Sequence, residues 1–317
     1  MKTLDILLFL ILISFSSYGL SEEVANYKDG EQHGKQTLYH IDGQLAQVAN
    51  YKDGELHGLW ESYYPKGQRE EVANYKDGER HGKQTSYHID GQLAQVVNYK
   101  DGKRHGLWES YYPNGQREEV ANFKDGERHG RQTSYYIDGQ LARVVNYTDG
   151  KLHFSNIKYF KNGQIHHVGY FINGKQHGEQ TSYHIDGQVA KVANYKVGKL
   201  HGKQLSYYEN GNSKLELESN YKDNLQHGVW IHYYENAKIM KKVSFSEGNQ
   251  EGFYINFDKN GYKLFSGYIY NNKRNGLYNW YHNNDQKWVE VYYNNDKVSE
   301  RTEWDKSGKI ISRCWIC

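Results

Sequence analysis

The chain has few of the residues that build a large core or a cross-linked domain. Among its 317 residues there are only 2 cysteines and 2 prolines, and the mean hydropathy is −0.97. Two cysteines cannot supply a four-ligand zinc site, and the low hydropathy leaves little apolar side chain to bury. We therefore expect only thin burial.

The chain also lacks a net charge of either sign. It has 40 Lys plus Arg against 38 Asp plus Glu, a formal charge of +2. This balance does not favour nucleic acid or an acidic membrane surface as a partner. The 16 histidines make the net charge depend on pH. An unperturbed imidazole titrates near ~6.5, so mild acid would make the chain distinctly cationic.

Long hydrophobic runs are missing beyond the N-terminus. The apolar run over residues 6–15 is well short of the ~20 residues that a membrane-spanning helix needs. Lys2 precedes the run, and Ser17 and Gly19 suit the −3 and −1 sites of a signal peptidase. We predict that residues 1–19 are a secretory signal, cleaved near Gly19. The mature protein would then be exported to the periplasm, the cell surface or the medium.

What the chain has in abundance is a repeated unit rich in tyrosine and glycine. A histidine recurs every 24 residues from His33 to His201 and is followed by Gly in all but one case. Each unit holds two segments bounded by dipeptides such as Asp90-Gly91 and Asp101-Gly102. These dipeptides accept the positive φ of tight hairpin turns. Each unit is therefore predicted to be one β-hairpin, and the chain a tandem array of hairpins.

The even period predicts ladders of like residues, because side chains alternate between the two faces of a strand. A turn centred on Asp90-Gly91 sets the cross-strand pairs. These are Thr85 with Val96, Lys83 with Asn98, Tyr87 with Ala94 and Tyr99 with Gly82. In the last pair an aromatic ring would cover backbone that lacks a side chain. The same spacing recurs at Gly58/Tyr75, Gly106/Phe123 and Gly130/Tyr147.

Neither predicted face is consistently apolar, as a sandwich or barrel would require. The predicted fold is therefore all-β: an elongated single-layer antiparallel sheet of tandem 24-residue hairpins. Each hairpin would contact only its neighbours. We expect the array over residues 20–300, in about eleven to twelve units, and a C-terminal cap over residues 301–317.

Two stretches depart from the regular unit. Near residues 153–176, Phe154 stands where Gly is usual, and we expect a local bend or junction there. Near residues 211–226, two extra residues lengthen the interval between His201 and His227 to 26. We expect a bulge or a longer loop to accommodate them.

The segments YKDGERHGKQTSYHIDGQL and YKDGKRHGLWESYYPNGQREEV resemble the variant MORN repeat of bacterial proteins. Its unit has the form Y-x-[ND]-G-[KE]-x-[HN]-G-x-[WY]-x-x-[YF]-[YF]-x-[ND]-G. The resemblance is close from Tyr27 to Tyr207 and looser from Tyr221 to Ser312. It implies a scaffolding, membrane-associated or protein-binding role. Many members carry an antitoxin label, which implies a partner toxin; a signal peptide would suit an immunity protein acting outside the cytoplasm.

The histidine ladder is a candidate metal site, but its spacing argues against one. Like positions in successive hairpins lie ~10 Å apart, whereas two ligands bound at ~2 Å to one zinc must lie within ~3.5 Å of each other. A histidine beside each turn that caps backbone groups is the favoured interpretation. The sequence therefore predicts no metal site and no cofactor.

No catalytic constellation stands out either, and every prominent carboxylate belongs to a repeated unit. A regular ribbon offers no single concave pocket in which an enzyme could concentrate its chemistry. We predict that the protein is not an enzyme. In the terminal run, Cys314 and Cys317 favour a local disulfide for an exported protein, with free thiols as the alternative.

We expect an exported interaction protein whose aromatic ladders contact a protein partner multivalently. The candidate binding residues are Trp60, Tyr63, Tyr64, Tyr87, Trp108, Tyr111, Tyr112, Tyr135 and Tyr183.

One alternative is a cell-wall or carbohydrate-binding module built of short aromatic hairpins. The tryptophans argue against it, because Trp60, Trp108 and Trp230 share one position and the others crowd the C-terminal end. Lipid association is a further alternative, weakened by the near-neutral charge. A structural spacer is the plainest interpretation.

Overall fold

The structure is a computed structural model that describes residues 20–209 and 213–315. All regular secondary structure in these two ranges is β-strand, and no helix there is long and apolar enough to cross a membrane. The predicted signal segment, residues 1–19, lies outside the described residues. The chain divides into two units, Met1–Leu152 and His153–Cys317, which we describe one at a time.

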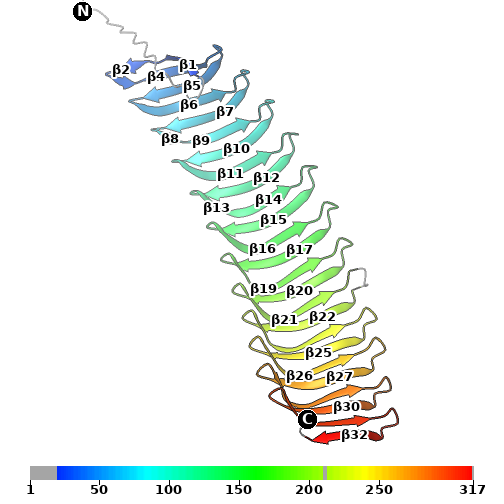
Figure 1. Ribbon diagram of the computed structural model, residues 1–317. Helices are drawn as coiled ribbons and strands as arrows, with labels where there is room; N and C mark the ends of the chain where they lie inside the picture. Colours follow the sequence, from blue (N-terminus) through cyan, green and yellow to red (C-terminus); the bar gives the residue numbers. More distant parts are fainter. Residues whose placement is uncertain (1–19, 210–212, 316–317) are drawn as a thin grey trace, which may run out of the picture. The chain divides into compact units, whose positions relative to one another are not determined.

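In unit 1 the long strands of the main sheet pair antiparallel in chain order, and in some hairpins a two-residue strand also pairs with the long strand before it (Figure 1). One further pair of two-residue strands forms a separate hairpin. The strands of this unit are β1 (Leu20–Val24), β2 (Tyr27–Lys28), β3 (Glu31–Gln32), β4 (Gly34–His40), β5 (Leu45–Lys52), β6 (Glu55–Tyr63), β7 (Arg69–Lys76), β8 (Glu79–Arg80), β9 (Gly82–Tyr87), β10 (Leu93–Lys100), β11 (Lys103–Tyr111), β12 (Arg117–Lys124), β13 (Glu127–Arg128), β14 (Gly130–Tyr135) and β15 (Leu141–Thr148).

Unit 2 continues with the same alternation of long and short strands. They are β16 (Lys151–Tyr159), β17 (Ile165–Ile172), β18 (Lys175–Gln176), β19 (Gly178–Tyr183), β20 (Val189–Lys196), β21 (Lys199–Tyr207), β22 (Leu215–Lys222), β23 (Leu225–Gln226), β24 (Gly228–Tyr233), β25 (Ile239–Ser246), β26 (Asn249–Phe257), β27 (Lys263–Tyr270), β28 (Lys273–Arg274), β29 (Gly276–Tyr281), β30 (Lys287–Asn294), β31 (Lys297–Trp304) and β32 (Ile310–Trp315).

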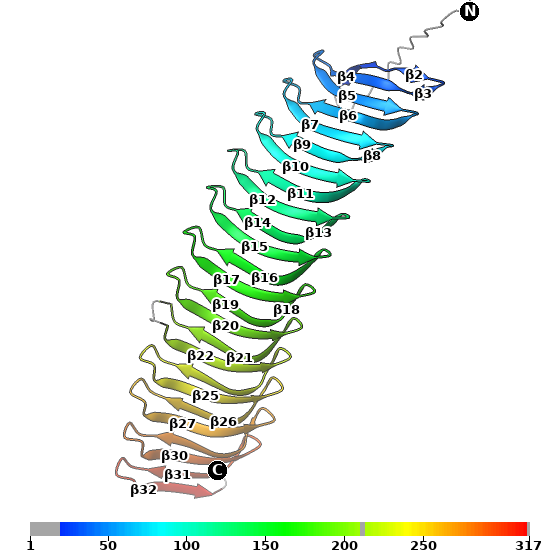
Figure 2. The same cartoon turned by 180° about the vertical axis from the view of Figure 1, so that it is seen from behind.

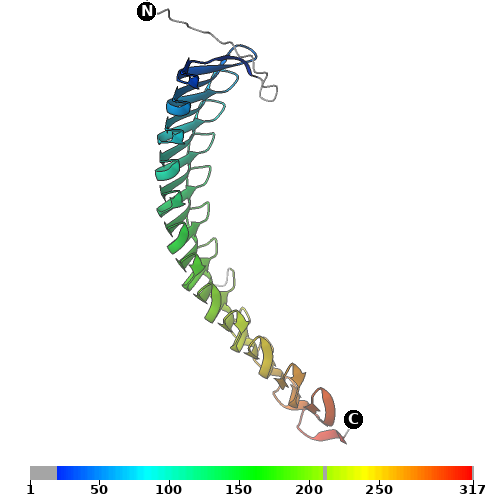
Figure 3. The same ribbon diagram turned by 90° about the vertical axis from the view of Figure 1, so that its left-hand side faces the viewer.

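Within each unit the hairpins form one open layer. Figure 2 shows the order of hairpins from behind, and Figure 3 shows them side-on, with no second layer of strands among the described residues of either unit. The predicted all-β, single-layer antiparallel array of hairpins is therefore confirmed. The last described hairpin, β31–β32, continues the pairing through Trp315.

Two kinds of turn alternate along the array. At Asp101-Gly102 both residues have positive φ, 48° and 71°, as a two-residue type I′ turn requires. At the other end of the hairpin the loop has three residues, Ile89 to Gly91, closed by a hydrogen bond from the His88 N–H to the Gln92 carbonyl (2.7 Å). Only Gly91 has positive φ there, 86°.

The three-residue loop changes one predicted pair. Thr85 does pair with Val96, Lys83 with Asn98 and Tyr99 with Gly82. Tyr87, however, pairs with Leu93, so the predicted pair of Tyr87 with Ala94 is wrong. A three-residue loop with glycine in the left-handed conformation leaves one residue unpaired in a β-bulge, and Ala94 occupies that place.

The Gly after all but one of the repeated histidines has a conformational role. Gly106 does pair with Phe123, and its φ is 85°, at a register shift in the ladder between β10 and β11. Phe154 adopts the same conformation with φ of 63°, and its pairing with Phe171 keeps the usual register. The division between the two units falls between Leu152 and His153.

The two extra residues in unit 2 lengthen one hairpin loop. The Tyr208 N–H donates to the Lys214 carbonyl (3.0 Å). In the regular loops the corresponding hydrogen bond joins residues four apart. The strands beyond, β22 to β24, resume the usual pairing. The predicted bulge or longer loop is thus a longer loop. At the N-terminal end, β1 pairs with β4 as β7 pairs with β9.

Candidate binding surface

One face of the sheet carries a row of buried side chains that runs across the strands. We call this face A, its opposite face B, and the buried line the central row. Large and small side chains alternate along it, because each large side chain lies over a small one on the neighbouring strand. In unit 1 the central row consists of Gln36, Ala49, Trp60, Ala73, Gln84, Val97, Trp108, Ala121, Gln132 and Val145.

The side chains of the central row are more buried than expected for a sheet with no second layer on it. Ala73 is 0% exposed, Val97 is 1% exposed and Gln84 is 7% exposed. Two rows flank the central row on face A and cover it. One consists of aromatic and arginine side chains, and the other of serine and glutamate side chains. The hydrophobic core of unit 1 is therefore a line along face A.

Arginines and aromatic rings alternate in the row next to the central row. The Arg80 guanidinium donates to the Tyr75 hydroxyl (3.2 Å) and the Tyr99 hydroxyl (3.4 Å) and lies over the Tyr99 ring. It also pairs with Glu71 (3.1 Å), which accepts a hydrogen bond from the Gln84 amide (2.6 Å). Burial works against the charge of Arg80, but these hydrogen bonds raise the pKa of its guanidinium.

The arrangement repeats 48 residues later with Arg128, which pairs with Glu119 (3.1 Å) and lies over the Tyr147 ring. Burial raises the pKa of Glu71 although Arg80 opposes that shift, so the ion pair adds little net stability. Its main effect is to fix side-chain positions on face A. Arg104, between the two networks, lies over the Phe123 ring.

The repeated histidines lie along the side of the sheet that carries the two-residue turns. In six of them the ring Nδ1 faces the Asp carboxylate of the next two-residue turn, at 3.2 to 3.7 Å. For His153 and His177, Asn173 and Val197 stand in place of that Asp. The pairs are His33 with Asp53, His57 with Asp77, His81 with Asp101, His105 with Asp125, His129 with Asp149 and His201 with Asp223. They link consecutive hairpins, and no cluster that could hold a metal ion occurs among the described residues.

The nine predicted binding aromatics are all half-buried. Trp60 and Trp108 lie in the central row, whereas the tyrosines flank the three-residue loops. The Tyr64 and Tyr112 hydroxyls donate to the backbone carbonyls of Tyr87 (2.9 Å) and Tyr135 (2.8 Å) on the next hairpin.

A histidine takes the same role in alternate hairpins. The ring Nε2 atoms of His40 and His88 contact the carbonyls of Tyr63 and Tyr111, at 3.0 Å. In unit 2 the His184 ring contacts the Tyr207 carbonyl at 3.4 Å, while Tyr183 lies beside it in β19. These side chains therefore join one hairpin to the next, and only part of each ring is left to meet a partner.

Face B is joined between hairpins by asparagines. The side-chain amides of Asn50 and Asn98 donate to the carbonyls of Leu59 (2.6 Å) and Leu107 (2.7 Å), nine residues further along. Towards the end of unit 2, tyrosines replace these asparagines. Phe253 there is 71% exposed, beside Tyr268.

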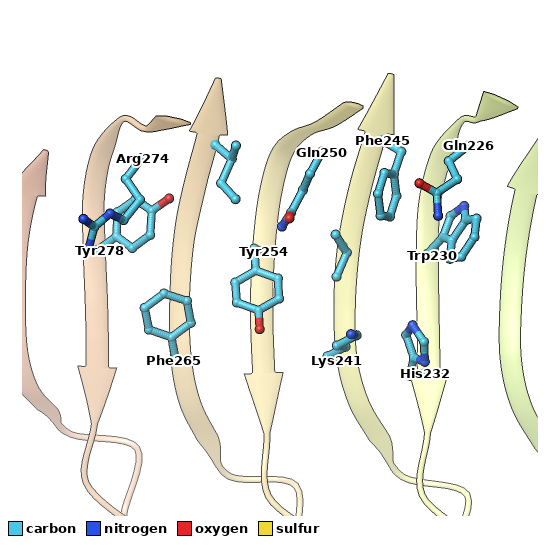
Figure 4. A pocket seen from close by; sticks show the side chains of 12 residues that line it. Gln226, Trp230, His232, Lys241, Phe245, Gln250, Tyr254, Phe265, Arg274 and Tyr278 are labelled. Carbon is cyan, nitrogen blue, oxygen red and sulfur yellow. The ribbon is translucent and has the colours of Figure 1, made fainter. Parts of the chain in front are cut away.

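Sequence reasoning missed a hollow on face A of unit 2, where the central row becomes aromatic. Trp230, Tyr254 and Tyr278 occupy the positions that glutamine or tryptophan hold in unit 1 (Figure 4). The other lining residues are Gln226, His232, Lys241, Val243, Phe245, Gln250, Phe265, Ile269 and Arg274. The signal that could have revealed the hollow is the change from Gln84 to Trp230 and Tyr278 in equivalent positions.

A glycine makes room for one of these rings. A Cβ on Gly267 would come within 2.4 Å of the Tyr278 ring, and the φ of Gly267 is not positive. The glycine is therefore needed for close approach of the ring. Burial raises the pKa of Tyr278 to about 12, and its hydroxyl donates to the Tyr268 carbonyl (2.7 Å).

The terminal cysteines are placed only in part. Cys314 lies in β32, whereas Cys317 and the predicted disulfide with it lie outside the described residues.

Comparison with protein families identifies the repeat. The model of the MORN repeat variant matches eight segments that make up more than half of the chain: residues 32–53, 56–77, 80–101, 104–125, 128–149, 176–196, 200–223 and 226–247. No curated protein matches the chain.

Among solved structures, similar chains occur in the TcdB2–TccC3–Cdc42 crystal structure and the Tc holotoxin pore of Photorhabdus luminescens. Each is 12% identical, with 93% of this chain and 18% of that chain covered and a TM-score of 0.18. The chain thus spans less than a fifth of their length, and so low a TM-score carries no argument about fold or function.

Proposed function

The chain belongs to the family of MORN repeat variants, and on that premise we propose that it is an exported, non-enzymatic scaffold that binds a protein partner through face A. An immunity-type role, in which the partner is a toxin, is one form of this proposal.

The observation that supports it most is the recurrence of the same side chains in the same register. The networks around Arg80 and Arg128 are 48 residues and four strand spacings apart, about 19 Å before twist. Partly exposed arginines and rings are favourable contact groups in protein interfaces. Identical groups at fixed intervals allow a repetitive partner to bind several at once, which raises avidity without new contacts.

The near-identical hairpins allow a sharp test. Deleting residues 81–128 joins Arg80 to His129 with the hairpin period intact, so the remaining hairpins keep their neighbours. Pull-down of the partner by chains shortened in 48-residue steps should weaken with each step, and circular dichroism should show that the sheet persists. Binding that survives the loss of every near-identical unit would contradict the multivalent proposal.

Export is tested separately by intact mass. The protein recovered from the periplasm or the medium should lack the mass of residues 1–19. Recovery of the full-length chain from the cytoplasm alone would contradict it.

Retention on purified wall polysaccharide would instead favour the carbohydrate-binding alternative. The half-buried rings, with tyrosine hydroxyls bonded to neighbouring backbone, offer little stacking surface in unit 1. Flotation with anionic liposomes would favour the membrane alternative.

A further inference from the structure

We propose that the hollow on face A of unit 2 binds an extended acidic peptide segment, with an apolar side chain on the aromatic floor and a carboxylate at Lys241. This rests on the proposed function only in taking a protein as the partner. It goes further by assigning a particular site, away from the near-identical hairpins, and the chemistry of the segment that fits it.

The floor of the hollow is apolar and continuous across neighbouring strands. The ring centroids of Trp230 and Phe245 lie 5.0 Å apart, and those of Tyr254 and Phe265 lie 5.4 Å apart. Val243 lies between these pairs, on β25. An aliphatic or aromatic side chain placed here would lose water on one side and contact rings on the other.

The polar atoms of the floor are already engaged. The Trp230 indole N–H donates to the Asn220 carbonyl (3.1 Å), and the Tyr278 hydroxyl donates to the Tyr268 carbonyl. The Tyr254 hydroxyl accepts a hydrogen bond from the Asn256 amide (3.1 Å). A sugar needs such groups for its own hydroxyls, and the floor offers few of them, since the remaining amides are those of Gln226 and Gln250 at one end of the hollow.

The charged groups of the hollow are all cationic, and one of them is free. Arg274 is neutralised by Asp296 (3.0 Å). Lys241 makes no hydrogen bond or ion pair with the described residues, and no carboxylate lines the hollow. Burial, and then Lys241 itself, lowers the pKa of His232, which is therefore uncharged at neutral pH. An anionic group would find a single unpaired ammonium beside an apolar floor.

Figure 4 shows how these groups lie. Lys241 and His232 are at one end of the hollow, and Gln226, Gln250 and Arg274 are at the other. A segment running along the strands would therefore meet the free cation at one end of its apolar contact. Lys191 occupies the same register position as Lys241, two hairpins earlier. Lys191 is opposite Ser206, and Lys241 is opposite Asn256. Lys191 does not line the hollow. It provides a matched control.

The test compares two peptides on the full-length protein. The first is acetyl-Leu-Phe-Glu-Glu-amide and the second acetyl-Leu-Phe-Gln-Gln-amide, each carrying the same uncharged dye and measured by fluorescence anisotropy at low salt. The wild type should bind the acidic peptide about tenfold more tightly, the effect of one charge-assisted contact. Lys241→Gln should abolish this preference, Lys241→Arg should restore it, and Lys191→Gln should leave it unchanged.

Equal binding of the two peptides to the wild type would overturn the proposal, as would a preference that Lys241→Gln leaves intact. Binding of chitohexaose in place of the peptides would assign the hollow to a glycan instead. Thermal unfolding of each variant shows whether the sheet is retained. Because a short probe touches one hollow only, its failure is distinguishable from failure of the multivalent scaffold, which the shortened chains test.

Discussion

The near-identical hairpins of unit 1 and the diverged hairpins over residues 226–294 of unit 2 share one backbone plan but differ in what they bury. In unit 1 the central row holds Gln84 and Trp108, and charged networks such as Glu71 with Arg80 cover it. In unit 2 the equivalent positions hold Trp230 and Tyr278, packed ring against ring. Register therefore comes from the turns and the period, whereas the chemistry of face A is set by a few central-row positions.

The two tryptophans at one register position offer the largest contrast. Trp230→Ala should destabilise the protein by about 3–5 kcal/mol, because Trp230 is only 8% exposed and lies between the Tyr221 and Phe245 rings. Trp108→Ala should have a clearly smaller effect, since Trp108 is half-buried and its ring contact with Phe123 is longer, 6.4 Å. Denaturant unfolding measures both. Equal losses would contradict the difference in burial between the two regions.

Gly267 is a second difference between the two regions. Gly267→Ala should cost about 1–3 kcal/mol, because the new Cβ would lie 2.4 Å from the Tyr278 ring, which must move. In unit 1 the equivalent residue is Ala73. Its neighbour in the central row is Gln84, whose side chain is slimmer than a tyrosine ring, so alanine fits there. In the Tyr278→Gln background, Gly267→Ala should therefore cost less stability in denaturant unfolding than it does in the wild type. An equal cost in both backgrounds would mean that something other than the ring requires the glycine.

Much of this plan could be predicted from the sequence. The even period and the Asp-Gly turns fixed the hairpins and the pairs around Thr85 and Lys83, because these depend on local backbone preferences. The pair at Tyr87 was wrong, since a three-residue loop and a two-residue turn can share the same dipeptide. The burial of the central row could not be predicted, because it depends on side chains from neighbouring hairpins. The hollow could not be predicted for the same reason, although Trp230 shares its register position with Trp60 and Trp108.

Phe154 stands where the other repeated histidines are followed by glycine, so its substitution tests why glycine is preferred at that position. Phe154→Gly should stabilise the protein by about 0.5–1 kcal/mol, because a non-glycine residue with φ of 63° is strained. Loss of the ring contact with Tyr170 offsets part of the gain. The reverse change in unit 1, Gly106→Phe, should destabilise the protein. Thermal unfolding of both variants measures this, and a lower melting temperature for Phe154→Gly would contradict the strain argument.

His232 should give the smallest effect, visible as a pH dependence. Its pKa is lowered by burial and then by Lys241, so the unfolded chain binds this proton more readily. The resulting stabilisation is present above pH ~6.5 and is lost as the pH falls below that value. His232→Ser, which introduces the residue that unit 1 has at Ser86, should flatten the fall in stability between pH 7 and pH 5. An unchanged slope would contradict the assignment.

The alignment of equivalent residues on one face is the claim on which the proposed scaffold depends. Leu59 and Leu107 are equivalent, both exposed on face B, and four strand spacings apart within unit 1. Spin labels at these positions, in a chain whose two cysteines are replaced by serine, allow the distance to be measured by electron–electron double resonance. We predict one narrow distribution near ~19 Å, widened only by the label linkers. A broad distribution, or a distance much greater than this, would contradict the constant register of the hairpins.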